Sequence, residues 1–383
     1  MNEEPSFTIG IEEEYLLVDR ETRDLVADPP PSLMAECEAV LGDAVRPEFL
    51  RCQIEVGSSV HSTLGEARAE MAKLRRSISD CAGAHGMALI AASTHPFADW
   101  STQRNTDKAR YNDLARDMQV LARRLLICGM HVHVAVEDEL LRFDLFNQLP
   151  YFLPHLLALS GSSPFWRGAE TGLQSYRLSV LDELPRTGLP PSFMNAAEYH
   201  RTVELLVHAG EIEDATKVWW DIRPSARFPT LEMRITDVCP LLDDAIAIAA
   251  LYRCIVRMLY RLRRDNQRWR YYSAFLVSEN RWLAQRFGTG KALIDFGKGE
   301  PIPFVDLVEE LIALLAEDAE HFGCAAEVAR AREIAANGTS ASRQLAIFRE
   351  KVNEGASEHE ALVAVVDHLM AESLVGCDAK EVA

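Results

Sequence analysis

The stretch CGMHVHVAV, residues 128–136, decides how the rest of the chain is interpreted, because polar and apolar side chains alternate along it. In a β-strand, residues i and i+2 point to the same face of the sheet. The apolar side chains therefore share one face: Met130, Val132, Val134 and Val136. His131 and His133 share the other face. The pattern predicts a strand over residues 127–136 with one face on the core and a histidine-bearing face opposite.

Three other segments place polar side chains opposite an apolar strand face. The segments are CQIEV at 52–56, LEMRI at 231–235 and, less regularly, FTIGIEEEYLLVD at 7–19. In the last of these, Glu12 and Glu14 share a face and Glu13 points away from them. If all four strands belong to one sheet backed by helices, seven polar side chains line its other face: Glu12, Glu14, Glu55, His131, His133, Glu232 and Arg234.

A face this rich in carboxylates indicates a cation site. Carboxylates held on one rigid sheet repel one another unless a positive group lies between them. Oxygen-rich sites suit Mg²⁺ or Mn²⁺. Each pair taken singly is more often an exposed strand face or a surface ion pair, but the repetition on separate strands favours a shared site. The sequence therefore predicts a divalent-cation site on this face.

The rest of the chain separates into a mixed region, residues 1–240, and a mainly helical region, residues 241–383. No linker rich in Gly, Ser or Pro divides them, so we expect a single continuous domain over residues 1–383. Apolar residues at helical spacing predict helices at 63–85, at 110–126 and from 241 onward. Strands are expected at 88–92, 218–223 and 230–236, and PRTGLPPSF at 185–193 predicts a loop.

Composition excludes several classes of protein. The 383 residues carry 40 Lys and Arg against 58 Asp and Glu, a net charge of −18 that argues against binding nucleic acid. The eight cysteines form no CxxC pair, so we expect reduced thiols and neither a zinc ribbon nor a disulfide framework. Without an export signal or an apolar span, the expected location is the cytoplasm, away from membranes.

Arginines cluster in SPFWRGAETGLQSYR at 163–177 and KVWWDIR at 217–223. Guanidinium groups hold carboxylate or phosphate oxygens through paired hydrogen bonds, although any single arginine is more often a structural ion-pair partner. The arginines considered for such contacts are Arg167, Arg177, Arg186, Arg223 and Arg234. The chain has no P-loop, no GxGxxG after a strand and no GxSxG. Cations on the sheet would therefore have to hold the phosphates of any nucleotide.

Five ordered motifs resemble one known family. FTIGIEEEYLLVD, GMHVHVAV, SPFWRGAETGLQSYR, LPRTGLPP and WWDIRPSARFPTLEMRITDVCP are similar to the carboxylate–amine ligases, also called glutamate–cysteine ligase type 2, of the glutamine synthetase-like superfamily. The resemblance implies an α+β fold, in which a curved antiparallel sheet has helices on its convex face and a helical C-terminal part follows. It also implies ATP-dependent joining of a carboxylate, typically the γ-carboxylate of glutamate, to an amine such as that of cysteine, through an acyl phosphate.

The resemblance also assigns roles to residues. It implies that Glu12, Glu14 and Glu232 bind Mg²⁺ or Mn²⁺, and that Glu55 adds a further carboxylate. His131 or His133 would ligate a cation or contact the phosphates of ATP, and the two alternatives stay open. The catalytic residues are expected to be Glu55, Arg177 and Arg234. The nucleotide contacts are expected to be His131, His133, Arg167 and Arg223.

Three other functions remain open at this stage. A phosphotransferase of the guanidino-kinase type would stop at the phosphorylated substrate. A metal-dependent amidohydrolase using the His131–His133 pair would act without ATP and prefer zinc. A non-catalytic nucleotide or metabolite sensor would bind ATP with Mg²⁺ without consuming it. The expected partners are small-molecule substrates, and a small homo-oligomer would be unsurprising.

Overall fold

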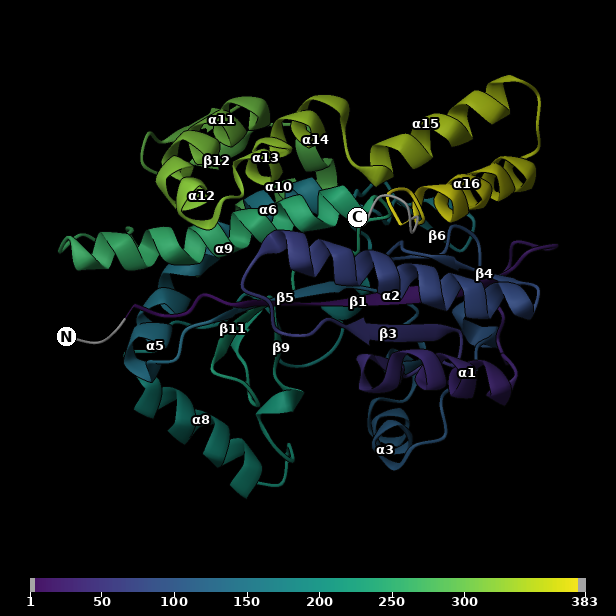
Figure 1. Cartoon of the computed structure of the whole chain (residues 1–383), viewed down its shortest axis with the longest axis horizontal. Coiled ribbons are helices and arrows are strands. Elements are labelled where there is room, and N and C mark those ends of the chain that lie inside the picture. Colours follow the sequence, from purple (N-terminus) through teal and green to yellow (C-terminus); the bar gives the residue numbers. More distant parts are fainter. Residues whose placement is uncertain (1–3, 378–383) are drawn as a thin grey trace.

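A seven-stranded antiparallel sheet forms the centre of the computed structural model, which describes residues 4–377 (Figure 1). Its order is β10–β11–β5–β1–β3–β2, and β4 pairs with the far end of β1. The strands are β1 (Ile9–Asp19), β2 (Val45–Pro47), β3 (Gln53–Gly57), β4 (Met87–Ile90), β5 (Met130–Ala135), β10 (Ile222–Pro224) and β11 (Thr230–Met233). The predicted α+β class with an antiparallel sheet is confirmed.

The register of the sheet brings the polar residues of different strands together. Glu12 lies opposite His131, and Glu14 lies opposite Glu55. Glu232 lies opposite His133 on one side and Arg223 on the other. Directly opposed residues have Cβ atoms about 4.5–5.5 Å apart, so these cross-strand pairs concentrate the polar side chains in a small area of one face.

Helices cover the other face of the sheet. α2 (Leu64–Ala84) packs on β1 and β4, α9 (Leu242–Arg264) packs on β5, and α16 (Glu358–Glu372) packs on β4 (Figure 1). α2 begins with a capping box between Thr63 and Glu66. The apolar strand faces are buried beneath these helices, as the full burial of Ile9, Val132 and Val134 shows.

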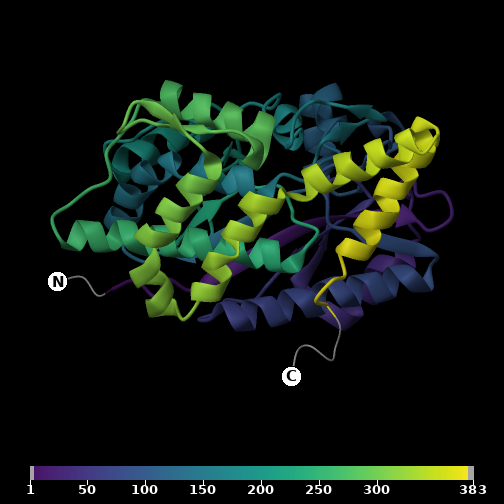
Figure 2. The ribbon, with the colours of Figure 1, turned by 90° about the horizontal axis from the view of Figure 1, so that it is seen from above.

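The second half of the chain adds a helical layer above α9. Seen from above, these helices lie over α9 and the sheet (Figure 2). They are α10 (Ala274–Phe287), α11 (Phe304–Leu314), α12 (Ala316–Phe322), α13 (Ala325–Ala329), α14 (Ala331–Asn337) and α15 (Ser340–Asn353), with a hairpin of β12 (Leu293–Asp295) and β13 (Glu300–Ile302). The predicted helical C-terminal part is confirmed, and the expectation of one domain over residues 1–383 stays a prediction.

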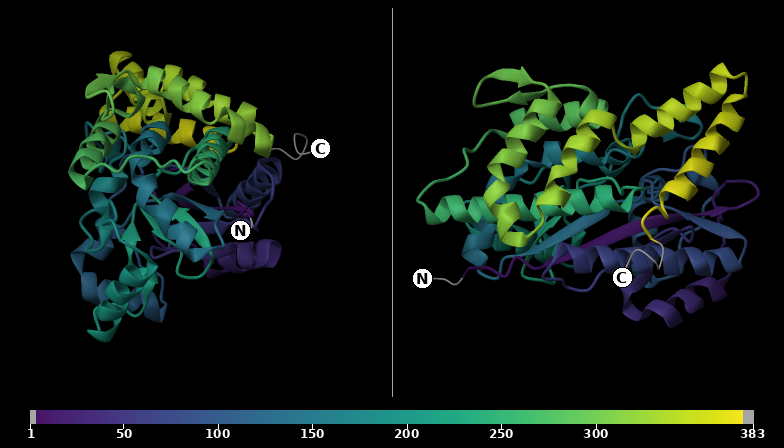
Figure 3. Two further views of the ribbon diagram at one scale, coloured as in Figure 1. Left: turned by 90° about the vertical axis from the view of Figure 1, so that its left-hand side faces the viewer. Right: turned by 45° about the horizontal axis from the view of Figure 1, so that its top comes forward.

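Smaller elements lie on the polar side of the sheet or beside it (Figures 1 and 3). The helices are α1 (Pro31–Leu41), α3 (Ala109–Met118), α4 (Val120–Arg123), α5 (Glu139–Gln148), α7 (Arg177–Leu181) and α8 (Ala196–His208). α6 (Leu153–Ser160) instead packs against α9 and α10 on the helical side of the sheet (Figure 1). The short strands are β6 (Phe165–Trp166), β7 (Ala169–Glu170), β8 (Thr187–Gly188) and β9 (Trp219–Trp220). Among the described residues no helix is long and apolar enough to cross a membrane, and all eight cysteines are free.

The structure corrects three expected elements. The helix expected over 110–126 is divided into α3 and α4 at Gln119, whose φ is 51°. The sequence has no Gly or Pro at this position that would have predicted the break. The strand expected over 218–223 is interrupted at Asp221, whose carboxylate accepts a 2.7 Å hydrogen bond from Arg281 of α10. Within the expected loop at 185–193, β8 pairs in parallel with β9.

Candidate functional site

A cavity of about 420 Å³ lies against the polar face of the sheet. Its floor is formed by side chains of β1, β3, β5 and β11, and α3 contributes to its wall. Nine of the ten residues predicted for the site line it: Glu12, Glu14, Glu55, His131, His133, Arg177, Arg223, Glu232 and Arg234. The alternation along the strands therefore places these groups in one cavity, although their roles stay predictions.

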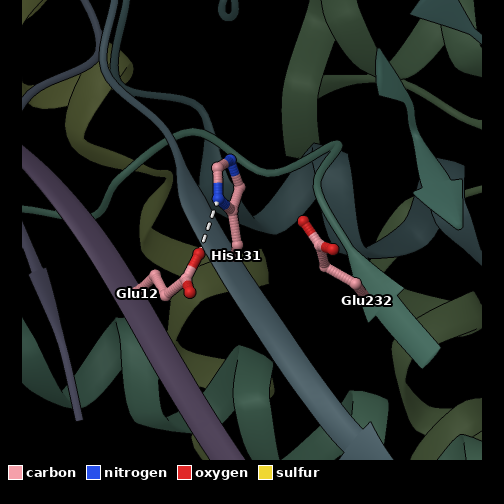
Figure 4. A group of neighbouring side chains, drawn as sticks. All are labelled: Glu12, His131 and Glu232. Atoms are coloured by element: carbon pink, nitrogen blue, oxygen red, sulfur yellow. Dashed lines mark hydrogen bonds and ion pairs between the residues drawn. The ribbon is translucent and has the colours of Figure 1, made fainter. Parts of the chain in front are cut away.

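One group in the cavity has the composition of a cation site. Ligand atoms of Glu12, His131 and Glu232, from three adjacent strands, all lie within 4.8 Å of one another (Figure 4). Nδ1 of His131 is 3.4 Å from Oε2 of Glu12, and Nε2 of His131 is buried without a hydrogen-bond partner. Two carboxylates and an imidazole with an unused nitrogen are donors that Mg²⁺ or Mn²⁺ accepts.

The charges around this group favour ionised carboxylates and a neutral imidazole. Burial alone would raise the pKa of Glu12, but hydrogen bonds from His131 and His133 outweigh it and lower the pKa well below its usual range. Burial together with the charge of Arg234 lowers the pKa of His131. Both carboxylates are thus charged at neutral pH, and the histidine has a lone pair available.

Glu232 is neutralised by two arginines. Burial would raise the pKa of Glu232, yet the charges of Arg234 and Arg223 keep it far below the ordinary value. Arg223 forms two hydrogen bonds with the carboxylate, from Nε at 2.8 Å and from Nη2 at 2.9 Å, and Arg234 pairs with the same group. A cation that binds Glu232 must therefore compete with Arg223 and Arg234 for the oxygens of this carboxylate.

A second group of carboxylates lies further along the sheet. Glu14 and Glu55 are joined there by Glu48, from the loop between β2 and β3. Burial and the charge of Glu14 raise the pKa of Glu48 to about 7, and burial with the charge of Glu48 raises the pKa of Glu55 well above its usual range. In residues 4–377, no Lys or Arg forms an ion pair with these three carboxylates. The sequence did not predict Glu48, because a loop residue has no strand alternation to place it.

Arg177 contributes a buried guanidinium to the cavity. It begins α7, where its backbone N–H donates to Oγ of Ser163, and its side chain donates to the carbonyls of Arg234 at 3.1 Å and Ile235 at 3.3 Å. Burial lowers the pKa of Arg177, and its Nε has no partner. Because no carboxylate of the described residues forms an ion pair with Arg177, its charge is available to an anionic ligand.

Arg167 does not join the others. It lies in the turn between β6 and β7, half of its side chain is exposed, and it pairs with Asp99 at 2.7 Å. Arg167 is absent from the cavity lining, and its expected contact with a nucleotide stays a prediction. The walls instead include cations and an aromatic residue of α3 and the segment before it, which the sequence did not single out: Lys108, Arg110 and Tyr111.

Comparison with known proteins identifies the same family as the motifs. The family model described as glutamate–cysteine ligase family 2 matches residues 8–368. A Rhodospirillum rubrum protein described as a candidate glutamate–cysteine ligase 2 is 60% identical over 382 residues, 98% of this chain and 98% of its own. A Roseiflexus sp. protein with the same description is 43% identical over 373 residues, 97% of this chain and 96% of its own.

Solved structures show the same fold at low sequence identity. The glutamate–cysteine ligase of Francisella tularensis in complex with AMP superposes with a TM-score of 0.71 at 14% identity, over 98% of this chain and 90% of that one. A bifunctional glutathione synthetase from Pasteurella multocida gives a TM-score of 0.65 at 14% identity, over 96% of this chain and 52% of that one. The fold and family predicted from the sequence are therefore confirmed. The chain belongs to the glutamate–cysteine ligase family 2, a family of ATP-dependent ligases that form a carbon–nitrogen bond.

Proposed function

We propose that this protein joins the γ-carboxylate of glutamate, or a similar carboxylate, to an amine such as that of cysteine, at the expense of ATP. The observation that carries the proposal is the convergence of Glu12, His131 and Glu232 within 4.8 Å in a cavity that also holds Arg177 and Arg234. Phosphoryl transfer depends mainly on positioning and on neutralising charge, and this arrangement supplies groups for both.

The donor atoms of one group in the cavity fit a divalent cation. Glu12, His131 and Glu232 would hold this cation, because their ligand atoms lie within 4.8 Å of one another. Glu14, Glu48 and Glu55 line the same cavity, but among the residues that the structure describes they form no second group this close. When bound, Mg²⁺ or Mn²⁺ would neutralise the phosphate oxygens of ATP and keep them aligned for transfer. The buried Nε2 atom of His131, which has no hydrogen-bond partner, is consistent with a ligand that arrives with the substrates.

The reaction needs no nucleophile from the protein. An oxygen of the substrate carboxylate attacks the γ-phosphorus of ATP, the bond to the β-phosphate oxygen breaks, and ADP leaves. The amine then attacks the carbonyl carbon of the acyl phosphate, loses a proton, and releases phosphate as the amide forms. Arg234 and Arg177 lie where cationic hydrogen-bond donors can stabilise negative charge on the transferring group or on the substrate carboxylate.

The direct test is incubation with ATP, Mg²⁺, glutamate and a panel of amines including cysteine, with ADP measured first and the amide product by mass spectrometry. The proposal requires ADP release that depends on both the carboxylate and the amine. ADP release without an amine would identify a phosphotransferase, and binding of ATP without its consumption would identify a sensor. Amide hydrolysis without ATP would identify the amidohydrolase.

Glu232→Gln tests the site itself. The change keeps the size of the side chain but removes a charge that lies within reach of both Glu12 and His131. We expect cation-dependent ADP release to be abolished with the thermal unfolding curve still cooperative. Glu309→Gln, a surface glutamate paired with Arg332, is the matched control and should retain full activity. Wild-type turnover by Glu232→Gln would remove Glu232 from the site.

A further inference from the structure

Glu13 separates the two site carboxylates of β1 but points to the opposite face of the sheet. Glu13 and Arg75 of α2 form an ion pair in which both side chains are 0% exposed. Arg75 donates from Nε to Oε2 of Glu13 at 2.9 Å and from Nη2 to Oε1 at 2.7 Å. The hydroxyl of Tyr15 donates to the same carboxylate at 2.6 Å. Both oxygens of Glu13 are therefore held from the helical side.

Arg75 also holds the chain that follows β11. Its Nη2 donates to the carbonyl of Cys239 at 2.8 Å and its Nη1 to the carbonyl of Pro240 at 2.5 Å. The residues just before these are bonded to β5, where Thr236 and Met130 exchange hydrogen bonds. One guanidinium thus connects β1, which bears Glu12 and Glu14, to the segment that continues from β11, which bears Glu232.

Stability does not account for this pair. Removing two charges from water costs several kcal/mol per ion, and buried pairs are often replaced by apolar residues with no loss of stability. The neighbours of Glu13 on the same strand face, Ile11 and Tyr15, show that large, mainly apolar side chains fit this layer. A bidentate guanidinium–carboxylate pair offers instead fixed distances and directions, which apolar packing lacks.

We propose that Glu13 and Arg75 are positioning residues that fix β1 relative to β11, so that Glu12 and Glu232 stay at the separation a shared divalent cation requires. The inference rests on the proposed cation site and adds to it two residues that touch neither cation nor substrate. When a residue that supports a metal ligand is mutated, the affinity of the site for its metal typically falls roughly 10- to 100-fold. The arrangement also explains a charged residue where the strand pattern calls for an apolar one.

The test is a Mn²⁺ titration followed by electron paramagnetic resonance, which measures cation binding independently of turnover. The site is defined as the Mn²⁺ that Glu232→Gln fails to bind. Arg75→Lys keeps the charge and loses the paired geometry. The double variant Glu13→Gln/Arg75→Met replaces the pair with neutral side chains of similar size. The control is Arg257→Lys, which alters an ion pair elsewhere in the fold, between Arg257 and the buried Asp318 at 2.7 Å.

We expect the double variant to unfold at a temperature close to that of the wild type while the dissociation constant for Mn²⁺ rises roughly 10- to 100-fold. Arg75→Lys should weaken Mn²⁺ binding to a similar extent, and Arg257→Lys should leave it unchanged. Wild-type Mn²⁺ affinity in the folded double variant, or failure of that variant to fold, would overturn the positioning role. Absence of Mn²⁺ binding by the wild type would overturn the proposed function instead.

Discussion

Replacing Gly129 with alanine should disable the site by displacing Arg177. A Cβ atom at position 129 would lie 2.3 Å from Nη2 and 2.8 Å from Cζ of Arg177. The backbone of Gly129 cannot yield easily, because its N–H donates to Glu14 at 2.7 Å and its carbonyl accepts from the N–H of Glu14 at 3.1 Å. The guanidinium must therefore move away from the carbonyls of Arg234 and Ile235 that hold it.

The size of the effect follows from that contact. Ordinary van der Waals contact begins near 3.4 Å, so the guanidinium must shift by about 1 Å. A displacement of about 1 Å in a group that orients a substrate can reduce the rate roughly 100-fold, equivalent to about 2.7 kcal/mol of transition-state stabilisation. We therefore expect kcat/KM of Gly129→Ala to fall about 100-fold.

The assay is ADP release at subsaturating glutamate, with the melting temperature recorded for each variant. Gly10→Ala is the control, since a Cβ there meets its nearest neighbour, Cβ of His133, only at 4.0 Å. If the clash acts through Arg177, the double variant Gly129→Ala/Arg177→Ala should be no slower than Arg177→Ala alone. A folded Gly129→Ala protein with wild-type kcat/KM would refute this reasoning.

Two further predictions concern stability and pH. Burial lowers the pKa of His95 to about 4, and its Nδ1 accepts hydrogen bonds from the N–H groups of Phe97 and Ala98. Because the unfolded chain protonates His95 near pH 6.5, acidification from pH 7 to pH 5 should remove about 2 kcal/mol of stability through this group. Urea unfolding should show a smaller loss in His95→Asn, and an equal loss would contradict the assignment. Burial and the charge of Glu14 raise the pKa of Glu48 to about 7, so the metal-free protein loses stability as the pH rises from about 4.5 to 7. Glu48→Gln should therefore raise the free energy of unfolding at pH 8 in EDTA by about 3 kcal/mol, and a lower melting temperature would show that the charge is already compensated.

The strand pattern predicted most of the site because it depends on a local rule. Alternation alone assigns Glu12, His131 and Glu232 to one face of their strands, and a sheet buried on its other face makes that assignment strict. The order of the strands is not local, since β1 lies between β3 and β5 in the sheet. Only the resemblance to a family indicated that the strands share one sheet, and the order that makes these side chains meet was not predicted.

Contacts between segments that are far apart in the sequence could not be predicted, because they depend on tertiary packing and not on a local pattern. Glu48 lies in a loop, and its proximity to Glu14 and Glu55 arises from tertiary packing. The pairing of Glu13 with Arg75 spans 62 residues. Alternation places Glu13 on the core face of β1, but no local pattern identifies Arg75 as its partner. Sequence periodicity specifies the direction of a side chain, whereas its partner depends on the whole fold.

The cavity contains two clusters of carboxylates, and the ligand-free protein compensates their negative charge in different ways. A cation that binds would therefore have to displace different groups at each cluster. At one end, the arginines Arg223 and Arg234 occupy the oxygens of Glu232, so an arriving cation competes with them. At the other end, Glu48 and Glu55 have raised pKa values because burial, and then the charges of neighbouring glutamates, oppose their ionisation. A cation there would relieve repulsion while displacing protons, whereas at Glu232 it would release arginine side chains that can then meet phosphate. The number of carboxylates in the sequence does not distinguish the two clusters. They differ in whether the fold places arginines beside the carboxylates, as it does at Glu232.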